Sequence, residues 1–206
     1  MEIEFHGANC VSLVAKSAHL LVDPTVPGLK VDEKKADIIL STFPQSLKTT
    51  GEQLLIDTPG EYEAKGVSIK GIAARGHMEE EGGRLATMYR IDMNNCRLAV
   101  TGHIYPELSD EQLEALGTID VLVVPVGGHG YTLDAAGAAQ VVRAVEPKLV
   151  IPTHFADSAV KYEVPQAELQ LFIDEIGGQV QEEAKLKFKT GDFPEQMTIV
   201  TLSRTS

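Results

Sequence analysis

The first half of the chain alternates short apolar stretches with turn residues, a pattern typical of β-strands. Gly7 and the Lys16–Ser17 turn separate the first apolar stretches, and the continuous apolar run over 36–41 indicates a strand buried on both faces. Asn94 and Asn95 predict a tight hairpin turn. The predicted strands cover residues 3–5, 10–15, 19–22, 36–41, 53–57, 62–64, 67–73, 87–92 and 97–101.

After residue 108 the pattern changes to helices that alternate with strands. Ser109 and Gln112 form a capping box, which predicts a helix that runs to about Leu116 and ends at Gly117. Helices are also predicted at 133–145 and 165–176, and strands at 121–126, 149–151, 185–189 and 197–202. Two sheets packed face to face with helices outside satisfy this order. We therefore expect residues 1–206 to form a single α/β domain, an αββα sandwich.

Composition and charge narrow the possible partners. The 206 residues carry a formal net charge of −12, which repels the phosphates of nucleic acids and anionic membrane surfaces. The sequence has no apolar run of about 18 residues, and its start, MEIEFHGANC, does not resemble a secretion signal. We expect a cytoplasmic protein that binds neither nucleic acid nor membranes. Its two cysteines, Cys10 and Cys96, are expected to be buried free thiols.

Several segments in the correct order resemble the metallo-β-lactamase superfamily, in its branch of small hydrolases related to the ascorbate-6-phosphate lactonase. These segments are FHGANCVSLVAKSAHLLVDP, ADIILST, PGEYEAKGVSIKGI, LSDEQLEALGTIDVLVVPVGG and AVEPKLVIPTHF. The resemblance implies the αββα fold. In that family a His-x-His-x-Asp-His loop, two further histidines and a bridging aspartate hold two metal ions, and zinc suits such ligands.

The loop that should carry the first four ligands has different residues at those positions in this chain. It follows ADIILST and reads TFPQSLK, so that Phe43, Gln45, Leu47 and Lys48 occupy the ligand positions. Of these only Gln45 offers a donor oxygen, a weak one. Lys48 could place an ammonium group where a metal ion would sit, or it could be a solvated surface lysine. The resemblance therefore does not imply the usual two-zinc site.

Histidines occupy the other three places of the family's site. His77 falls at the isolated histidine, His103 at the bridging aspartate and His154 at the histidine on the tip of a strand. Three imidazoles around one point can hold a metal ion and leave a fourth position open. We therefore predict a metal site of His77, His103 and His154 for one Zn, Mn or Fe ion, with no metal at all as the alternative. His129, in a glycine-rich loop, is expected to be exposed.

Two functions remain open at this level. The first is a non-catalytic relative that binds a small ligand or a protein partner, which the loss of all four loop ligands favours. The second is a one-metal hydrolase of lactones, esters or phosphoesters. Asp23, Asp57 and Glu61 are candidates to orient the histidines, and the latter two could equally be turn formers. The chain could also form a homo-oligomer, as relatives do.

Overall fold

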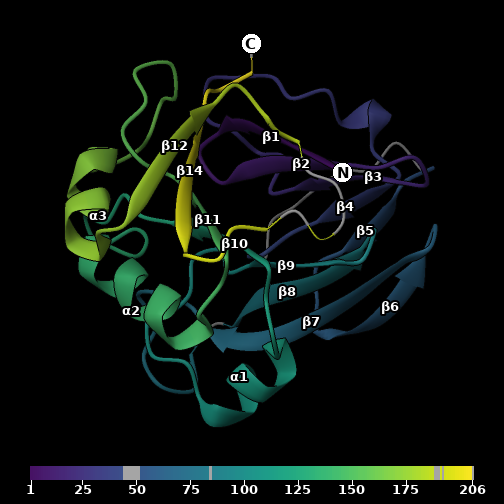
Figure 1. Ribbon diagram of the computed structural model, residues 1–206, viewed down its shortest axis with the longest axis horizontal. Coiled ribbons are helices and arrows are strands. Elements are labelled where there is room, and N and C mark those ends of the chain that lie inside the picture. Colours follow the sequence, from purple (N-terminus) through teal and green to yellow (C-terminus); the bar gives the residue numbers. More distant parts are fainter. Residues whose placement is uncertain (44–51, 84, 188–190, 192, 206) are drawn as a thin grey trace.

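Two β-sheets pack face to face in the computed structural model, which describes residues 1–43, 52–83, 85–187, 191 and 193–205 (Figure 1). The smaller sheet has the strand order β13-β1-β2-β3-β4-β5. Its strands are β1 (Glu2–Gly7), β2 (Cys10–Val14), β3 (His19–Val22), β4 (Ile38–Leu40), β5 (Leu54–Ile56) and β13 (Leu186–Lys187).

The larger sheet has the order β12-β14-β11-β10-β9-β8-β7-β6. Its strands are β6 (Gly60–Ala64), β7 (Val67–Arg75), β8 (Leu85–Met93), β9 (Cys96–Val100), β10 (Val121–Pro125), β11 (Leu149–Thr153), β12 (Gln179–Glu183) and β14 (Thr198–Leu202). The helices are α1 (Asp110–Leu116), α2 (Ala135–Val145), α3 (Leu169–Ile176) and the short 3-10 helix η1 (Glu33–Lys35).

Three apolar clusters give the sandwich its layers. The first lies between the sheets and includes Phe5 and Leu20 from the smaller sheet and Tyr89 from the larger one. The second lies between the outer face of the larger sheet and the helices, and it includes Val124 and Phe172. Both cysteines are buried free thiols, as predicted. The described helices are all too short or too polar to cross a membrane.

The predicted α/β sandwich is confirmed, with unequal outer layers. Helices α1, α2 and α3 gather on the side of the larger sheet, as Figure 1 shows. The outer face of the smaller sheet is instead covered by the segments around Val26, Val31 and Val160, which pack on Cys10 and Leu21. Within the described residues, η1 is the only helical turn in that layer.

The carboxyl ends of parallel strands from both sheets meet at one edge of the sandwich. Strands β3, β4 and β5 run parallel in the smaller sheet, as do β9, β10 and β11 in the larger one. The sheets touch where Thr42, after β4, lies against Gly102, after β9. A Cβ at position 102 would lie 2.2 Å from Thr42 Oγ1, and Gly102 has a φ of +63°, so the contact requires glycine.

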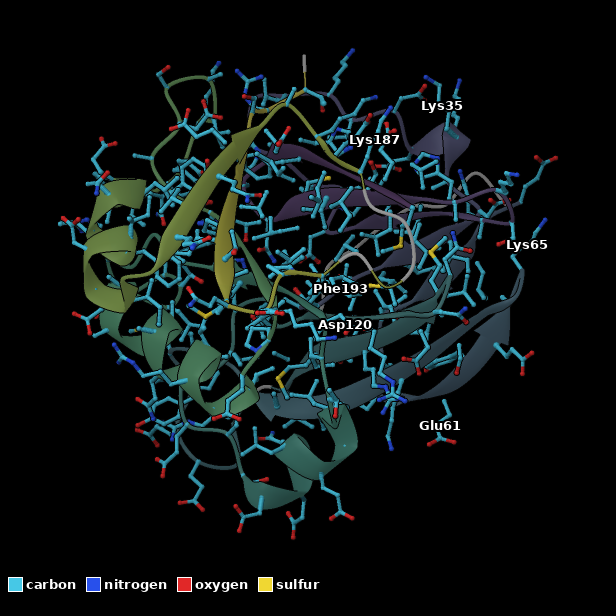
Figure 2. All side chains as sticks on the ribbon, in the orientation of Figure 1. Lys35, Glu61, Lys65, Asp120, Lys187 and Phe193 are labelled. Carbon is cyan, nitrogen blue, oxygen red and sulfur yellow. The ribbon has the colours of Figure 1, made fainter. Side chains whose placement is uncertain are left out.

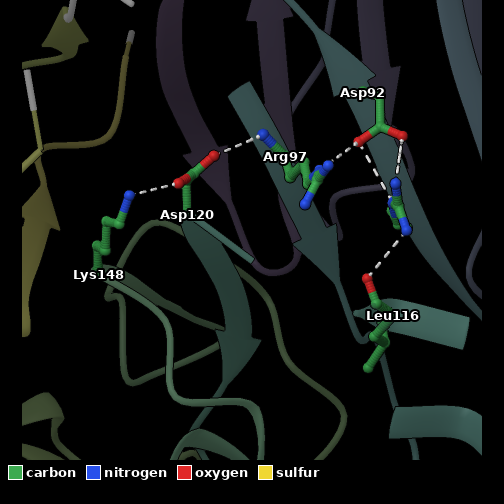
Figure 3. A network of polar contacts seen from close by, with 6 residues as sticks. Asp92, Arg97, Leu116, Asp120 and Lys148 are labelled. Atoms are coloured by element: carbon green, nitrogen blue, oxygen red, sulfur yellow. Dashed lines mark hydrogen bonds and ion pairs between the residues drawn. The ribbon is translucent and has the colours of Figure 1, made fainter. Parts of the chain in front are cut away.

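A network of charged groups joins neighbouring elements at the start of β10 and β11 (Figure 3). Asp120 accepts a hydrogen bond from the backbone N–H of Arg97 and one from Lys148 Nζ, both at 2.9 Å. Asp92 pairs with Arg97 and, at 2.8 Å, with Arg90. Arg90 also donates to the last carbonyl group of α1 at 3.4 Å. The network therefore links β8, β9, β10, β11 and α1.

Most predicted elements are present, and two differ from the prediction. The helix predicted over 165–176 begins only at Leu169, because the backbone N–H of Ala167 donates to Gly127 at 2.7 Å and holds the preceding residues in an extended segment. Strand β12 was not predicted, because all five of its residues are polar or exposed. It forms through parallel pairing with β14.

Candidate functional site

The three histidines of the predicted metal site come from three loops at the edge where the sheets meet. His77 follows β7, His103 follows β9 and His154 follows β11. The backbone N–H of His77 donates to the carbonyl of His103 at 2.9 Å, and the rings of His103 and His154 lie at right angles with centroids 4.8 Å apart. The structure therefore brings His103 and His154 into direct ring contact and places His77 beside His103.

Two tyrosines complete an aromatic group around these rings. Tyr131 stacks on His154 with ring centroids 5.4 Å apart, and its ring meets the edge of His103 at 5.3 Å. Tyr162 lies 5.0 Å from His154. The sequence did not identify either tyrosine, because no spacing motif connects a tyrosine 23 residues before His154 or one eight residues after it with that histidine. Together the two tyrosines fix the plane of the His154 ring.

Gln166 determines how His154 presents its ring nitrogens. Its Nε2 donates to the carbonyl of Val164 at 2.9 Å, which leaves Oε1 facing His154 Nδ1 at 3.1 Å. Because Oε1 can only accept, Nδ1 of a neutral His154 carries the hydrogen and Nε2 keeps its lone pair. Gly127 makes room for this pair, since a Cβ there would meet His154 and Gln166 at 1.9 and 2.4 Å.

Burial keeps the imidazoles neutral. It lowers the pKa of His103 to about 3, with a further contribution from His154 and His77. It lowers the pKa of His154 to about 4, although the hydrogen bond that His154 donates to Gln166 opposes the shift. It also lowers the pKa of His77. The Nδ1 atoms of His77 and His103 are buried, and no described residue forms a hydrogen bond with them. Such unpaired polar atoms are costly to bury, which makes them candidates for a ligand.

A hydrogen-bonded floor lies beneath the histidines. The carboxylate of Asp23 accepts from Asn9 Nδ2 at 2.6 Å, from the backbone N–H of Thr42 at 2.8 Å and from Thr42 Oγ1 at 2.6 Å. Thr153 Oγ1 donates to Asn9 Oδ1 at 2.7 Å. Burial raises the pKa of Asp23 despite these hydrogen bonds. Asp23 therefore fixes the strand ends, and Gln166 is the residue that orients His154.

Three residues of this region have a strained backbone. Ala8, Asp23 and His154 have φ values of +47°, +45° and +55°, a left-handed conformation that side chains other than glycine rarely adopt. The backbone N–H of His154 donates to the carbonyl of Ala8 at 2.7 Å. Strain of this kind is typical of functional sites.

Two adjoining cavities open onto the histidines and share the side chains of Phe43, His103 and Tyr131. The tyrosine cavity, of about 280 Å³, is also lined by His154 and Tyr162 among others. The methionine cavity, of about 190 Å³, has these other lining residues: His77, Met78, Glu79 and Gly130. Both volumes are small for ligand sites, which commonly measure about 300–1,000 Å³.

The other sequence candidates have different positions. Phe43 lines both cavities and packs against the helix-side core, whereas Gln45, Leu47 and Lys48 lie outside the described residues. Asp57 is exposed at the end of β5. Glu61 lies on β6, 3.6 Å from Lys70, and points away from the sheets in Figure 2. His129 is exposed, as predicted.

A larger groove of about 1130 Å³ lies elsewhere, around Glu2, Lys187 and Phe193. Figure 2 labels two of its lining residues, Lys187 and Phe193. Lys187 Nζ pairs with Glu2 at 3.1 Å, and Lys148 Nζ lies 4.8 Å from the centre of the Phe193 ring. This groove has no histidine in its lining, so the two cavities at the histidines are the better candidate for a reactive site.

The donors fit a metal ion by their chemistry. Neutral imidazoles bind metals, and two buried Nδ1 atoms lack a partner within the part of the chain that the structure describes. His154 has the arrangement common in metal ligands, in which the second ring nitrogen donates to a neighbouring acceptor. The spacing of these donors is less favourable for holding a metal ion. Among the described residues, no group of three or more His, Cys, Asp or Glu side chains is placed to hold one ion.

Comparisons with known proteins agree with this fold. A family model described as a β-lactamase superfamily domain matches residues 2–154. A protein from Thermoplasma acidophilum, named a metal-dependent hydrolase, is 30% identical in an alignment 195 positions long that covers 75% of this chain and 83% of the relative. A second protein of that name, from Thermoplasma volcanium, is 27% identical over the same shares of both chains.

Solved structures show the same architecture. One from Thermotoga maritima, described as a Zn-dependent hydrolase of the metallo-β-lactamase superfamily, has a TM-score of 0.73 and 22% identity over 98% of this chain and 97% of its own. A metallo-hydrolase from Ignicoccus hospitalis has a TM-score of 0.60 and 17% identity, over 85% and 89% of the two chains. The match over residues 2–154 shows that this chain belongs to the β-lactamase superfamily.

Proposed function

We propose that the chain is a hydrolase of small molecules that works with one metal ion at His77, His103 and His154. The observation that carries the proposal is the pair of buried Nδ1 atoms, on His77 and His103, that have no hydrogen-bond partner among the described residues, beside a His154 whose Nε2 is free of the hydrogen. The names of the relatives as metal-dependent hydrolases support the same function.

Each group around the site would have a defined task. A metal ion bound there would supply Lewis acidity, which activates water near neutral pH and polarises the bond to be cleaved. The three imidazoles would hold it, and their burial keeps them in the neutral form that binds metals. Gln166 and Tyr131 orient His154. The two cavities would hold a small substrate and limit the water around it.

A second candidate is a non-catalytic protein that binds a small ligand in the same cavities. Phe43 at the first ligand position favours it, as do Gln45, Leu47 and Lys48 at the other three. The replaced residues include the family's loop aspartate, whose carboxylate commonly handles the proton of the attacking water. The described residues also hold no ready-made group of three donors.

Metal content distinguishes the two candidates. The protein is purified without a histidine tag, incubated with Zn, Mn or Fe, desalted and analysed by mass spectrometry for metals. We expect about one ion per chain in the wild type and a loss of most of it in His103→Ala. His129→Ala is the matched control, because His129 is exposed and lines neither cavity.

A panel of esters, lactones and phosphoesters then tests catalysis. Metal that is lost in His103→Ala together with the hydrolysis of at least one substrate class supports the proposal. No metal above background after incubation would reject the metal-dependent hydrolase and leave the ligand-binding function.

A further inference from the structure

We propose that Arg204 is a positioning residue for the candidate site. Its ion pair with Asp157 holds the loop 155–166 in place. This loop carries Tyr162, whose ring contacts that of His154. Arg204 is not among the described residues that line the two cavities, so it acts on the site only through the loop. The inference concerns the geometry of the site and goes beyond the proposed function, because it applies equally to a hydrolase and to a ligand-binding protein.

The loop 155–166 forms one wall of the tyrosine cavity. Its side chains in the lining of that cavity are Tyr162, Glu163, Val164 and Gln166. Two of them also hold His154. The ring of Tyr162 lies 5.0 Å from the His154 ring, and Gln166 Oε1 lies 3.1 Å from its Nδ1. The position of this loop therefore determines both the shape of the cavity and the orientation of His154.

The carboxylate of Asp157 is shared between the loop and Arg204. Its Oδ1 accepts a hydrogen bond from the backbone N–H of Ala159 at 2.9 Å, which closes a turn at the start of the loop. Its Oδ2 accepts from Arg204 Nε at 2.8 Å. The side chain of Asp157 is 15% exposed and that of Arg204 is 28% exposed. A short, charge-assisted hydrogen bond that is partly shielded from water contributes more than an exposed ion pair.

Arg204 is itself fixed on strand β1 before its side chain reaches Asp157. Its backbone forms a parallel bridge with Phe5, and the backbone N–H of Thr205 donates to the Phe5 carbonyl at 2.8 Å. The arginine stem passes close over Gly7, where a Cβ would lie 3.0 Å from Cδ of Arg204. Gly7 has a φ of +107°, which also favours glycine. The smaller sheet therefore presents the guanidinium to the loop.

Beyond Asp157 the loop docks on the outer layer of the smaller sheet. The backbone N–H of Lys161 donates to the carbonyl of Pro27 at 2.9 Å. Val160 is buried in the same apolar cluster as Val26. These contacts do not involve Arg204, so its loss should loosen the loop without unfolding the chain. The N–H of Lys161, which bonds across to another segment, reports whether the loop is docked.

Amide hydrogen exchange of the metal-free protein, followed by NMR, tests the contact. Exchange at Lys161 should be at least about tenfold faster in Arg204→Ala than in the wild type, because the loop undocks more often. Arg143→Ala is the matched control. It removes the ion pair of Arg143, on α2, with Glu175, on α3, and neither residue lines a cavity. An unchanged exchange rate at Lys161 in Arg204→Ala would overturn the inference.

A double-mutant cycle tests whether Arg204 acts through Asp157. Asp157→Asn removes the charge but keeps a side-chain oxygen for the N–H of Ala159. In the Asp157→Asn background, Arg204→Ala should add little to the exchange rate at Lys161, because the ion pair is already lost. Arg204→Lys keeps the charge and should restore part of the protection. If the effects of the two single variants simply multiply in the double variant, Arg204 does not act through Asp157.

The ring of His154 provides a readout that a general loss of stability would not move. Because Tyr162 lies against this ring, its ring current shifts the imidazole ¹H resonances. In metal-free Arg204→Ala these resonances should move in the direction seen in Tyr162→Leu, and in Arg143→Ala they should stay in place.

His154 resonances that do not move in Arg204→Ala would overturn the inference, even in a protein that proves to be a metal-dependent hydrolase. Resonances that move as expected would support it, even in a protein that binds no metal and hydrolyses nothing. The test therefore separates the role of Arg204 from the proposed function.

Discussion

At the scale of single residues, the chemistry of the site depends on which ring nitrogen of His154 carries the hydrogen. The amide of Gln166 is anchored to Val164 and faces Nδ1 with its oxygen. Tyr131 and Tyr162 hold the ring from two further directions. A histidine held in this way presents one nitrogen, Nε2, as an acceptor or a metal ligand.

This arrangement predicts the tautomer of His154. Long-range ¹H–¹⁵N NMR spectra of the metal-free protein at neutral pH should show the Nδ1–H form. In Gln166→Leu the Nε2–H form should appear, because the acceptor for Nδ1 is gone. Gln170→Leu, an exposed glutamine-to-leucine change on α3, should leave the spectrum of His154 unchanged. An Nε2–H tautomer in the wild type would contradict the prediction.

Burial of the imidazoles also predicts a pH dependence of stability. The pKa values of His103 and His154 fall to about 3 and about 4, from an ordinary value near 6.5. Between pH 6.5 and 4 the unfolded chain therefore binds protons that the folded chain does not. The free energy of unfolding should fall as the pH falls through this window, by up to about 1.4 kcal/mol per imidazole and pH unit.

Urea unfolding of the metal-free protein at pH 7, 5.5 and 4.5 measures this dependence. Carboxylates contribute to it as well, so the comparison with His103→Asn isolates one imidazole. The variant should lose stability less steeply with falling pH than the wild type. The same slope in both proteins would show that His103 titrates normally.

At the scale of elements, the network in Figure 3 holds the strand starts together on the side opposite the histidines. Asp120 is its central residue, because its carboxylate binds Arg97 and Lys148 while its backbone carbonyl accepts from Leu149 at 2.9 Å. The Asp120 side chain is 14% exposed and that of Lys148 is 47% exposed. A charge-assisted hydrogen bond to a backbone N–H contributes more than an exposed ion pair.

Asp120→Ala should therefore lower the free energy of unfolding by about 1–3 kcal/mol, since the backbone N–H of Arg97 loses its acceptor. Lys148→Ala should cost less, about 1 kcal/mol or below, because it removes only the exposed pair and the contact of the ammonium with the Phe193 ring. Urea denaturation measures both values. If the two variants lose equal stability, the hydrogen bond to Arg97 contributes nothing beyond the ion pair.

At the scale of the whole molecule, the end of the chain adds a strand to each of the two sheets. Strand β13 pairs with β1, and β14 pairs with β11 and β12. Thr205 donates from its backbone N–H to the carbonyl of Phe5 at 2.8 Å, and Arg204 pairs with Asp157 at 2.8 Å. Elements from both ends of the sequence therefore share the core between the sheets.

These connections predict that residues 1–206 unfold as one unit, in line with the single domain expected from the sequence. Thermal unfolding followed by far-UV circular dichroism and by calorimetry should show one coincident transition. Two separate transitions would contradict the single domain. Deletion of residues 184–206 removes β13 and β14 and should leave the chain unfolded, since both sheets lose a paired strand.

The sequence by itself determined the elements whose signals are local. Alternating apolar positions predicted most strands, and the Ser109–Gln112 capping box predicted α1. Asn94 and Asn95 predicted a turn, and both have positive φ values in the structure. Segments that resemble the superfamily, in the correct order along the chain, also identified the family and predicted that His103 and His154 share one site. The structure has the two rings in contact.

Only the tertiary structure decided what depends on contacts between distant segments. Strand β12 exists because β14 offers it a partner, although its own residues lack an apolar pattern. Gln166 faces His154 because the backbone N–H of Ala167 donates to the carbonyl of Gly127. This bond holds an extended segment where the sequence predicted a helix. Local propensity and periodicity describe a residue's chain neighbours, whereas the aromatic group, the cavities and the tautomer of His154 depend on residues that meet only after folding.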